Sequence, residues 1–408
     1  MTSYRNSDPR PPIMAGSPVP SNWRVPRADW DRPPWNRWSF QHIREILPTV
    51  EVSCGDRRGG GLPVASQDIG AIVFEAVDGS RMSVETMLDE TYTDGFIVIR
   101  NGAVVHESYF NGMGPDSRHL SQSVAKSVTG TVAGVLIGQQ LLDPQAPLTE
   151  YLPELAETAW NGATLQHALD MTSGVAFDEE YTSVTSDIGQ TDVASGWKPV
   201  PPDAPEGFDW PATVWDQILG LKEQEAPHGS RFKYRSIETD VVAHCLERVS
   251  GKRLADLVSD ELWVPMGAEQ DAYFTVDSGG FALADGGFNA CLRDYVRVGM
   301  LYLEDGRSIQ GHQVLPAEWV ADVRGGAHGL FNDDHRDILP NGRYRNTFWI
   351  ADETRETIMA LGVFGQMIHV SPETGTVVAK LSSWPDFLDD THFANTLRAI
   401  AAISEALG

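Results

Sequence analysis

The segment SQSVAKSVTGTVAGVLIGQQLLD (121–143) decides the organisation of the chain. Four valines recur along it at helical spacing: Val124, Val128, Val132 and Val135. This period predicts an apolar helix, and the Asp143-Pro144 pair predicts its end. Ser123 and Lys126 lie where a loop enters this helix. The segment therefore predicts a central helix with a reactive pair at its start.

Strand signals lie on both sides of this helix. Upstream, GFIVIRNGAVVHESYF (95–110) is typical of a β-hairpin, because two β-rich runs flank the turn sequence Asn101-Gly102. Downstream, three β-like runs and an amphipathic helix close the chain: 357–362, 366–371, 376–383 and 391–407. Residues 145 to about 290 are mostly helical, with candidate helices at 165–171, 211–220 and 238–250. We expect the terminal strands to join one sheet and the middle to form a helical insertion.

This pattern divides the chain into three parts. Residues 1–36 are a Pro-rich arm that cannot form a core of its own. Its tryptophans, with the nearby Trp38, favour an arm that packs on the body of the protein. We place an α/β domain in 37–122 with 291–408, and a mainly helical domain in 123–290. The polar stretch 177–205 is expected to be a long functional or mobile loop.

The composition narrows the classes of partner. Of 408 residues, 31 are Lys or Arg and 57 are Asp or Glu, so the net charge is −26. This acidity disfavours nucleic acid and anionic membranes, because binding phosphates requires a basic surface. Cys54, Cys245 and Cys291 are far apart, which supports neither a disulfide framework nor a zinc site. The chain starts without an apolar signal-peptide core and contains no stretch long enough to span a membrane. We expect a cytoplasmic protein.

The sequence motifs of several catalytic mechanisms are absent. The chain has no HExxH, no GxSxG, and neither GxxxxGK[ST] nor GxGxxG, so we expect no metal and no nucleotide cofactor. Ser-x-x-Lys remains, and it occurs three times: Ser123/Lys126, Ser195/Lys198 and Ser230/Lys233. Because only six residues are Lys, at least two of these pairs are expected to be accidental.

Ser123 and Lys126 are the favoured pair, because a predicted helix holds them together. Residues three apart share one face of a helix, so the amine can reach the hydroxyl. Desolvation of Lys126 is expected to let it lose its proton near neutral pH and take the serine proton. The helix N-terminus and the Ser123 N–H can face a developing oxyanion. The alternative for Ser123 alone is a helix-capping serine.

The second candidate is the Tyr-x-Ser sequence Tyr234-Arg235-Ser236. Its phenol can relay protons between a nucleophile and a leaving group. Similar patterns occur at 181–183, 109–111 and 344–346, so an ordinary packing tyrosine is the alternative. Tyr234 is favoured because a turn and a short extended run precede it and a predicted helix follows.

The third candidate is GVFGQ (362–366), at the edge of a predicted strand. Glycines let a backbone approach a bound group closely, so the N–H of Val363 is a candidate oxyanion donor. An ordinary strand bend is the alternative.

The order and spacing of these three candidates resemble the serine β-lactamase and penicillin-binding superfamily, on its class C and esterase side. Six segments are similar to the 6-aminohexanoate-dimer hydrolases, or nylon-oligomer hydrolases: NRWSFQHIREILP (36–48), TYTDGFIVIRNG (91–102), RHLSQSVAKSVTGTV (118–132), LTEYLPELA (148–156), DGGFNACLRDYVRVG (285–299) and VVAKLSSWPD (377–386). The resemblance runs from about residue 34 to 405. It implies an α+β, serine β-lactamase-like fold, with an antiparallel sheet flanked by helices plus a mainly helical domain. Residues 87–400 would form one catalytic unit.

The resemblance also implies roles for individual residues. Ser123 would be the nucleophile, Lys126 its base and Tyr234 the proton relay to the leaving group. The N–H groups of Ser123 and Val363 would form the oxyanion hole. The stretch DEEYTSVTSDIGQTDVASGW (178–197) is similar to the family's mobile substrate loop. The implied substrate-binding residues are Tyr181 at the scissile group, Asp192 for a substrate ammonium, Trp197 as a cover, Asp285 as a residue that tunes amide activity, and Phe364 beside the oxyanion donor.

The chain departs from the family in two places. The resemblance implies Asn at the position of Asp285 in members with strong oligomer activity. The carboxylate in this chain therefore leaves the preferred substrate open. The family's His in the Gly-rich strand is Phe364 here, which changes a side chain beside the oxyanion donor. In addition, the chain has no Lys-Thr-Gly, so we do not expect efficient β-lactam hydrolysis.

These observations leave three functions to compare. The first is a serine hydrolase that cleaves linear 6-aminohexanoate oligomers through an acyl-enzyme and also hydrolyses short-chain esters. The second is a carboxylesterase of the same fold with little amide activity, since amides demand protonation of the leaving group. The third is a binding or peptidoglycan-sensing module, which a fold cannot exclude. The expected partner is a small amide or ester substrate, with an amine group favoured by Asp192, and the resemblance implies a homodimer.

Overall fold

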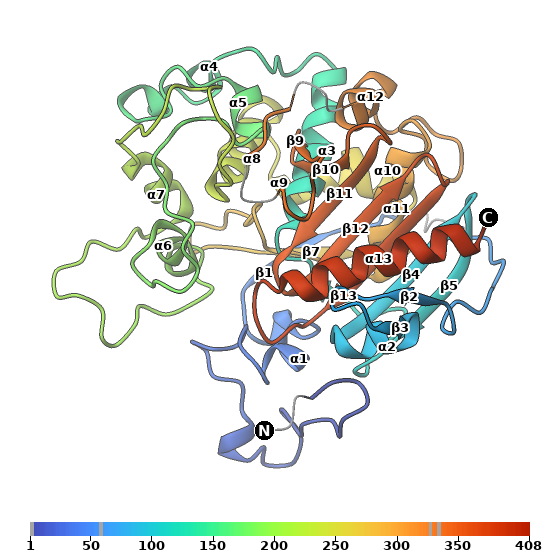
Figure 1. The fold of residues 1–408 in the computed structure, drawn as a ribbon. Helices are drawn as coiled ribbons and strands as arrows, with labels where there is room; N and C mark the ends of the chain where they lie inside the picture. Colours follow the sequence, from blue (N-terminus) through green and yellow to red (C-terminus); the bar gives the residue numbers. More distant parts are fainter. Residues whose placement is uncertain (1–3, 57–59, 326–328, 333–335) are drawn as a thin grey trace.

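A seven-stranded antiparallel sheet forms the centre of the molecule (Figure 1). The computed structural model describes residues 4–56, 60–325, 329–332 and 336–408. The strand order is β5-β4-β13-β12-β11-β10-β9. The strands are β4 (Thr93–Arg100), β5 (Ala103–Tyr109), β9 (Arg343–Arg345), β10 (Phe348–Asp352), β11 (Thr357–Gly362), β12 (Gln366–Ser371) and β13 (Thr376–Ser382). The upstream hairpin and the C-terminal strands therefore share one sheet, and the predicted fold class is confirmed.

The Asn101-Gly102 turn closes the predicted hairpin. Asn101 and Gly102 have φ angles of 49° and 77°, the left-handed conformation that these two residue types adopt most readily. On its other side β4 pairs with β13, with Val98 opposite Val378. This pairing joins the two ends of the sequence in the middle of the sheet.

Smaller elements complete the architecture. The other strands are β1 (Thr49–Val52), β6 (His119–Leu120), β7 (Ala272–Thr275) and β8 (Phe288–Ala290), which form a second sheet in the order β1-β7-β8-β6, and the pair β2 (Val73–Glu75) and β3 (Arg81–Ser83). The α-helices are α1 (Asn36–Ser39), α2 (Val84–Glu90), α3 (Val124–Gly138), α4 (Leu148–Tyr151), α5 (Leu165–Leu169), α6 (Asp187–Ala194), α7 (Val214–Gly220), α8 (Ile237–Ser250), α9 (Leu254–Val258), α10 (Val264–Met266), α11 (Leu292–Leu303), α12 (Ala317–Gly325) and α13 (Asp390–Ala406). Short turns of helix are η1 (Ser21–Trp23), η2 (Ile43–Glu45), η3 (Pro153–Glu157), η4 (Ser259–Trp263) and η6 (Val363–Gly365).

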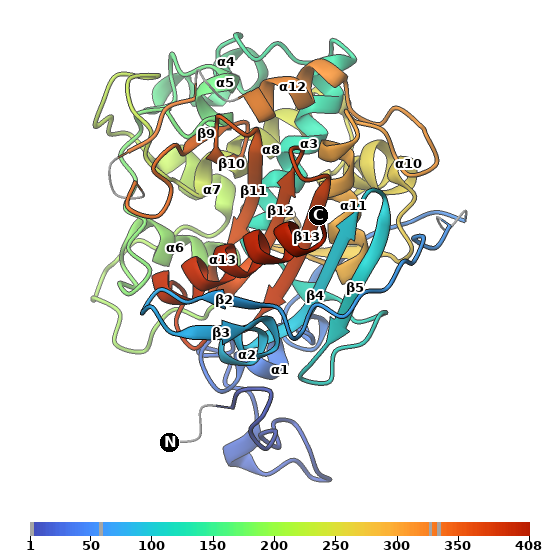
Figure 2. The same cartoon turned by 45° about the vertical axis from the view of Figure 1, so that its right-hand side comes forward.

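Helices cover both faces of the central sheet (Figures 1 and 2). Phe96 of β4 belongs to the same apolar core as Ile400 of α13. Its neighbour Ile97 belongs to the core that contains Val296 of α11. Successive side chains of a strand point to opposite faces, so β4 contributes to both cores. Burial on both faces explains the continuous apolar runs of the central strands, 96–99 in β4 and 377–379 in β13.

Helix α3 is as central as the sequence predicts. Val124, Val128 and Val132 are buried. Its glycines allow close packing, because a Cβ at Gly134 would lie 2.5 Å from the Trp319 ring. The helix starts directly after Ser123, so the packing of α3 fixes the position of this serine.

The polar stretch 177–205 is less irregular than predicted. It contains α6, whose first turn is capped by Ser186: the Ser186 Oγ accepts a hydrogen bond from the Gly189 N–H at 3.2 Å. The sequence analysis missed this helix because few apolar residues mark it. The helices predicted at 165–171, 211–220, 238–250 and 391–407 are present with slightly different ends. The division into an α/β and a helical domain stays a prediction.

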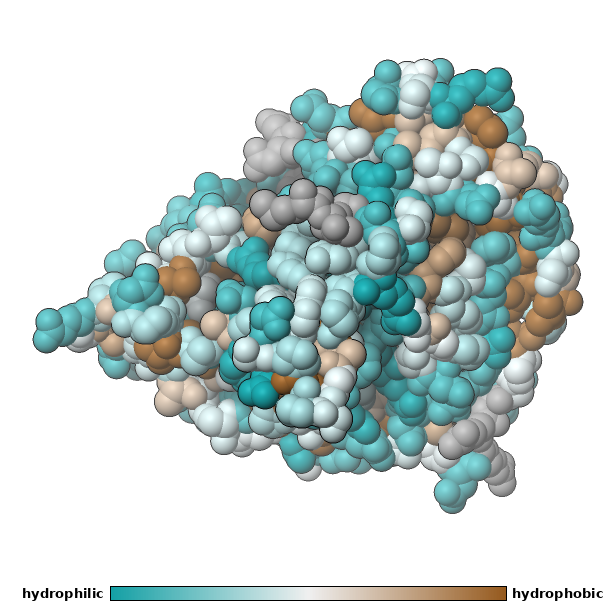
Figure 3. All heavy atoms as spheres, turned by 90° about the horizontal axis from the view of Figure 1, so that it is seen from below, coloured by the Kyte–Doolittle hydropathy of each residue, from teal (hydrophilic) through white to brown (hydrophobic). Residues whose placement is uncertain are grey.

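The surface is mainly hydrophilic where Figure 3 shows it. Hydrophilic residues cover most of that face, and hydrophobic residues form separate patches. This agrees with the net charge of −26. None of the described helices combines the length and the hydrophobicity that crossing a membrane requires.

The N-terminal arm packs on the body, as its tryptophans predict. Trp30 is fully buried, whereas Trp35 and Trp38 are half-buried. Residues 1–3 of the predicted arm lie outside the described residues. Trp30 donates through Nε1 to the Trp197 carbonyl at 2.9 Å, and the two rings meet edge to face. The arm therefore contacts the predicted substrate loop.

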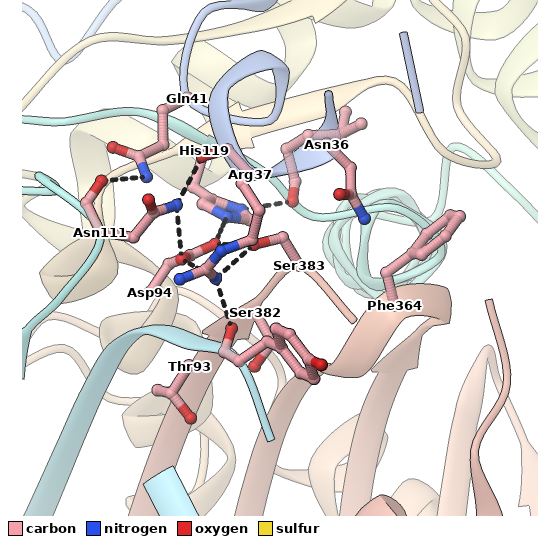
Figure 4. Close-up of polar contacts among 12 residues, drawn as sticks. Asn36, Arg37, Gln41, Thr93, Asp94, Asn111, His119, Phe364, Ser382 and Ser383 are labelled. Carbon is pink, nitrogen blue, oxygen red and sulfur yellow. Dashed lines mark hydrogen bonds and ion pairs between the residues drawn. The ribbon is translucent and has the colours of Figure 1, made fainter. Parts of the chain in front are cut away.

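A buried polar cluster holds the end of this arm against the sheet (Figure 4). Arg37 of α1 donates to Asp94 of β4 at 2.8 Å and to the Ser383 Oγ at 2.8 Å. Asp94 also contacts His119 Nε2 at 3.0 Å and accepts from the Ser383 Oγ at 2.6 Å and the Asn111 Nδ2 at 3.0 Å. We call these residues the anchoring cluster. They fasten α1, β4 and β6 together beside Phe364.

Candidate active site

The candidate nucleophile lies at the N-terminus of α3. Ser123 is the residue before the first helical turn, and its side chain does not cap the helix. The preceding residue, Gln122, has a φ of 50°, a conformation that costs energy for a residue other than glycine. Such strain concentrates at functional sites, because the surrounding structure has to hold it in place.

Lys126 contacts Ser123 directly. Its Nζ donates to the Ser123 Oγ at 2.9 Å and to the Asp285 carbonyl oxygen at 2.5 Å. The side chain is buried and lies over the Tyr234 ring, with Nζ 5.3 Å from the ring centroid. This geometry is what a serine and its proton acceptor require.

The other two Ser-x-x-Lys pairs make different contacts. Lys198 forms ion pairs with Asp31 at 2.9 Å and Asp192 at 3.1 Å. Lys233 forms an ion pair with Glu225 at 2.9 Å. Both lysines thus bind carboxylates, which agrees with the prediction that two of the three pairs are accidental.

The expected low pKa of Lys126 is wrong. Burial lowers the pKa of this amine, but the nearby acidic groups Tyr234 and Asp285 outweigh burial and raise the pKa above its usual value. The sequence prediction considered only desolvation. It did not anticipate that distant segments would place acidic groups around the amine.

Two carboxyl groups near the Lys126 amine, Asp285 and Asp240, have displaced pKa values themselves. Burial raises the pKa of Asp285 to about 6, although the Lys126 charge opposes the shift. Burial also raises the pKa of Asp240 on α8, and the nearby Asp285 raises it further. Asp240 accepts hydrogen bonds from the N–H groups of Ala284 and Asp285 at 2.9 and 3.3 Å. Both carboxyl groups in turn contribute to the raised pKa of Lys126, together with Tyr234 and Glu179.

Tyr234 joins Ser123 and Lys126 as predicted. Burial raises the pKa of the Tyr234 phenol, while the charge of Lys126 and a hydrogen bond with Ser123 lower it. The Tyr234 ring stacks on Trp349, with centroids 5.6 Å apart and an interplanar angle of 22°. The phenol is therefore fixed beside both the nucleophile and the amine.

Tyr181 is held by a residue that the sequence analysis did not select. Its hydroxyl donates to Glu179 at 2.8 Å, and the Ser236 N–H donates to the same carboxylate at 2.9 Å. Glu179 thus links the substrate loop to the Tyr-x-Ser segment. Its place two residues before Tyr181 in the loop is the only signal that pointed to it.

The two residues whose N–H groups are candidate oxyanion donors lie at one cavity. Ser123 and Val363 both line the cavity at Lys126. In the part of the chain that the structure describes, neither backbone N–H donates to another protein group. Gly362 lets its strand approach the nucleophile, because a Cβ there would lie 2.4 Å from the Ser121 carbonyl oxygen. Gln366 steadies this turn by donating to the Phe364 carbonyl at 3.2 Å.

The predicted substrate residues gather around one cavity, which we call the polar cavity. Ser123, Lys126, Tyr181, Asp192, Trp197, Asp285, Val363 and Phe364 all line it. Trp197 is buried and donates through Nε1 to the Thr275 Oγ1 at 2.9 Å. Phe364 is buried and packs edge to face on Phe40 at 5.3 Å. Trp197 and Phe364 therefore form fixed walls.

The Asp192 carboxylate is already paired with a lysine, which the sequence analysis did not predict. The resemblance implies a carboxylate that receives a substrate ammonium, but Lys198 already contacts this carboxylate at 3.1 Å. Lys198 also contacts Asp31 of the arm, so one cation bridges two carboxylates. An incoming ammonium would compete with Lys198 for Asp192.

The N-terminal arm contributes two lining residues that the sequence analysis missed. Asp31 and Arg32 both line the polar cavity. The resemblance did not cover the first 33 residues, and nothing in a Pro-rich arm marks a site residue. Only the burial of Trp30 could have indicated that its neighbours approach the body. Among the described residues, no three His, Cys, Asp or Glu side chains lie close enough together to hold a metal ion.

The comparison with known proteins agrees with this geometry. The model of the Beta-lactamase family matches residues 84–403, so the chain belongs to the β-lactamase family. The 6-aminohexanoate-dimer hydrolase of Paenarthrobacter ureafaciens is 35% identical over 378 residues, which cover 92% of this chain and 91% of that protein. The predicted resemblance is therefore confirmed, and the chain is a hydrolase related to the 6-aminohexanoate-dimer hydrolases.

Solved structures show the same relationship. A Bacillus anthracis protein, provisionally assigned as a 6-aminohexanoate-dimer hydrolase, is similar with a TM-score of 0.84 and 28% identity over 95% of this chain and 98% of that chain. A family VIII carboxylesterase is similar with a TM-score of 0.54 and 14% identity over 76% of this chain and 92% of that chain. The second likeness shows the shared fold alone.

Proposed function

We propose that the protein is a serine hydrolase that cleaves linear amides, including 6-aminohexanoate oligomers, and short-chain esters through an acyl-enzyme on Ser123. The observation that carries the proposal is the 2.9 Å contact between Lys126 Nζ and Ser123 Oγ at the N-terminus of a buried helix. The name of the Paenarthrobacter relative supports the choice of substrate.

The reaction follows from the groups around the serine. The Ser123 Oγ attacks the carbonyl carbon, and its proton passes to the Lys126–Tyr234 pair, which accepts it in the form that has already lost one proton to water. The N–H groups of Ser123 and Val363 stabilise the oxyanion. The C–N or C–O bond then breaks, and Tyr234 returns the proton to the leaving nitrogen or oxygen. Water attacks the acyl-enzyme, gives a proton to the same pair, and the Ser123 Oγ leaves with that proton.

Two further statements belong to this proposal. We propose that the enzyme works as a homodimer, as the resemblance implies, and that it resides in the cytoplasm and acts on nylon by-products. The three cysteines are buried, which fits a reducing compartment. Light scattering on the purified protein and fractionation of the source cells test these statements.

The alternative is a carboxylesterase with little amide activity. The ion pair between Lys198 and Asp192 favours it, since it occupies the carboxylate that an amine-bearing substrate would use. The buried carboxylate of Asp285 favours the carboxylesterase as well, because the resemblance implies Asn at this position in oligomer-active relatives. Rates on the linear dimer and on a short-chain ester distinguish the two.

The test is the release of 6-aminohexanoate from its linear dimer by the parent and by Ser123→Ala. We expect the variant to lose at least about 10³-fold in kcat/KM, because the acyl-enzyme of the proposed reaction forms on the Ser123 Oγ. Ser230→Ala is the matched control, since this serine belongs to an accidental Ser-x-x-Lys pair and should change nothing. Equal turnover by Ser123→Ala would contradict the proposal. No turnover of the dimer by the parent, with ester turnover intact, would favour the carboxylesterase.

A further inference from the structure

Ser123 lines two cavities. One is the polar cavity, which Lys126, Asp192 and Asp285 also line. The other is a larger space of about 410 Å³, which we call the apolar cavity and which Tyr234 also lines. Tyr181 and Val363 line both. Its volume falls in the range of about 300–1,000 Å³ that is typical of small-molecule sites.

The walls of the apolar cavity come from several segments of the chain. Trp349 of β10, Leu361 of β11 and Met367 of β12 form its sheet side. Phe393 of α13 and Leu339, before β9, add further apolar surface. Binding of a hydrocarbon group against this wall is favourable by about 25 cal/mol for each Å² of apolar surface removed from water.

The charges at this cavity disfavour an anionic ligand. Among the described residues that line it, Glu179, Asp389 and Asp390 are acidic, and Lys233 is the basic one. Lys233 contacts Glu225 at 2.9 Å, and Arg231 and Arg235 contact the same carboxylate. A carboxylate placed in this cavity would lose water and face three acidic side chains against one basic side chain.

The position of Tyr234 tells which half of a substrate lies here. Tyr234 lines the apolar cavity, whereas Lys126, Asp192 and Asp285 line the polar one. In the proposed reaction Tyr234 protonates the leaving group, so the leaving group has to lie on the side of Tyr234. The acyl group then occupies the polar cavity.

We infer that the apolar cavity binds an uncharged hydrophobic leaving group, an alkyl or aryl amine or alcohol. This inference rests on the proposed function and sharpens its substrate class. The acyl carbon is transferred to the Ser123 Oγ, the C–N or C–O bond breaks, and the hydrophobic product takes the proton from Tyr234. Water then releases the acyl group. The linear 6-aminohexanoate dimer is a poorer substrate on this view, because its leaving group ends in a carboxylate.

A matched pair of amides tests the inference. The linear dimer and 6-aminohexanoic acid hexylamide share one acyl group, and their leaving groups differ chiefly in the terminal carboxylate. We expect kcat/KM for the hexylamide to be at least tenfold higher. An equal or higher value for the dimer would overturn the inference.

A cavity-filling variant gives a second readout. Leu361→Trp should lower the ratio of kcat/KM for the hexyl ester over the methyl ester of 6-aminohexanoic acid by at least tenfold. Leu141→Trp is the control, since Leu141 is 48% exposed and lines neither cavity. An unchanged ratio in Leu361→Trp would overturn the inference.

A fluorophosphonate probe separates this inference from the proposed function. Labelling of Ser123 together with no preference among leaving groups would overturn the inference alone. No labelling of Ser123 and no hydrolysis of any ester or amide would overturn the proposed function and the inference with it.

Discussion

Two clusters of fully buried charge behave in opposite ways in this protein. In the anchoring cluster, Asp94 has a lowered pKa, because Arg37, His119 and Ser383 together outweigh the effect of burial. In the second cluster, which consists of Lys126, Tyr234, Asp240 and Asp285 and which we call the catalytic cluster after its proposed role, burial outweighs the other effects and raises the pKa of Asp285 to about 6. Burial is the same in both places, so the number of hydrogen-bond donors and cations at each carboxylate decides the difference.

The difference corresponds to two uses of buried charge. Asp94 interacts with Arg37, His119, Ser383 and Asn111, so its charge is permanent and holds the arm. In the catalytic cluster Asp240 keeps a carboxylate oxygen without a hydrogen-bond partner among the described residues. Groups with few partners can change their protonation during a reaction, which a matched ion pair cannot do without losing stability.

The largest effect is expected from removing the Lys126 amine. Lys126→Met should reduce kcat/KM about 10²- to 10⁴-fold, because the Lys126–Tyr234 pair, which accepts the Ser123 proton in the proposed reaction, loses its amine. Steady-state kinetics with a short-chain ester measure this. Lys252→Met is the control, since Lys252 pairs with Asp260 at the surface. If both variants retained the parental rate, the catalytic cluster would be structural, like the anchoring cluster.

The next effect concerns stability rather than rate. Arg37→Met should lower the free energy of unfolding by about 3–5 kcal/mol, because Asp94 would stay buried without its main cation. Urea unfolding measures this. Arg248→Met is the matched control; its ion pair with Glu154 is exposed and should contribute less than about 1 kcal/mol. A similar small loss in both variants would show that the anchoring cluster is not held by its charge.

The third prediction uses the pKa of Asp285, about 6 in the folded protein. The usual value of 3.8 is lower, so the folded state loses stability as pH rises from about 4 to 6, when this carboxyl has to ionise. Asp285→Asn removes that loss. We expect its advantage over the parent in unfolding free energy to be about 2–3 kcal/mol larger at pH 7.5 than at pH 4.

The same variant tests the link between Asp285 and the amine. Because Asp285 helps to raise the pKa of Lys126, Asp285→Asn should move the rise of kcat/KM with pH to lower pH. It should also increase hydrolysis of the linear dimer several-fold, as expected from the Asn of oligomer-active relatives. An unchanged pH–rate profile would separate Asp285 from the chemistry.

The smallest effect is expected from breaking the ion pairs that Lys198 forms with Asp31 and Asp192. Lys198→Met frees Asp192 and Asp31 for a substrate ammonium. We expect KM for 6-aminohexanoic acid methyl ester to fall several-fold, and KM for the methyl ester of hexanoic acid to stay the same. Measuring both esters distinguishes charge recognition from a general change in the cavity. An equal change for both would exclude Asp192 as an ammonium site.

Features that depend on neighbouring residues could be predicted from the sequence. The period of four valines specified α3, the Asn101-Gly102 turn specified the hairpin, and the spacing of Ser123 and Lys126 placed both on one helical face. These signals are reliable because turn conformations and helical periods are properties of short segments. The order of the three motifs along the chain was sufficient to indicate the family.

Features that depend on distant segments required the folded chain. The pKa of Lys126 follows from Asp285 and Tyr234, which belong to other elements. The pairing of Lys198 with Asp31 and Asp192 joins the arm to the substrate loop. An electrostatic interaction depends on the distance between charges in space and on their burial, and separation along the chain reports neither. The sequence therefore indicated the candidate reactive residues, and the packing of remote segments set the charges and the space around them.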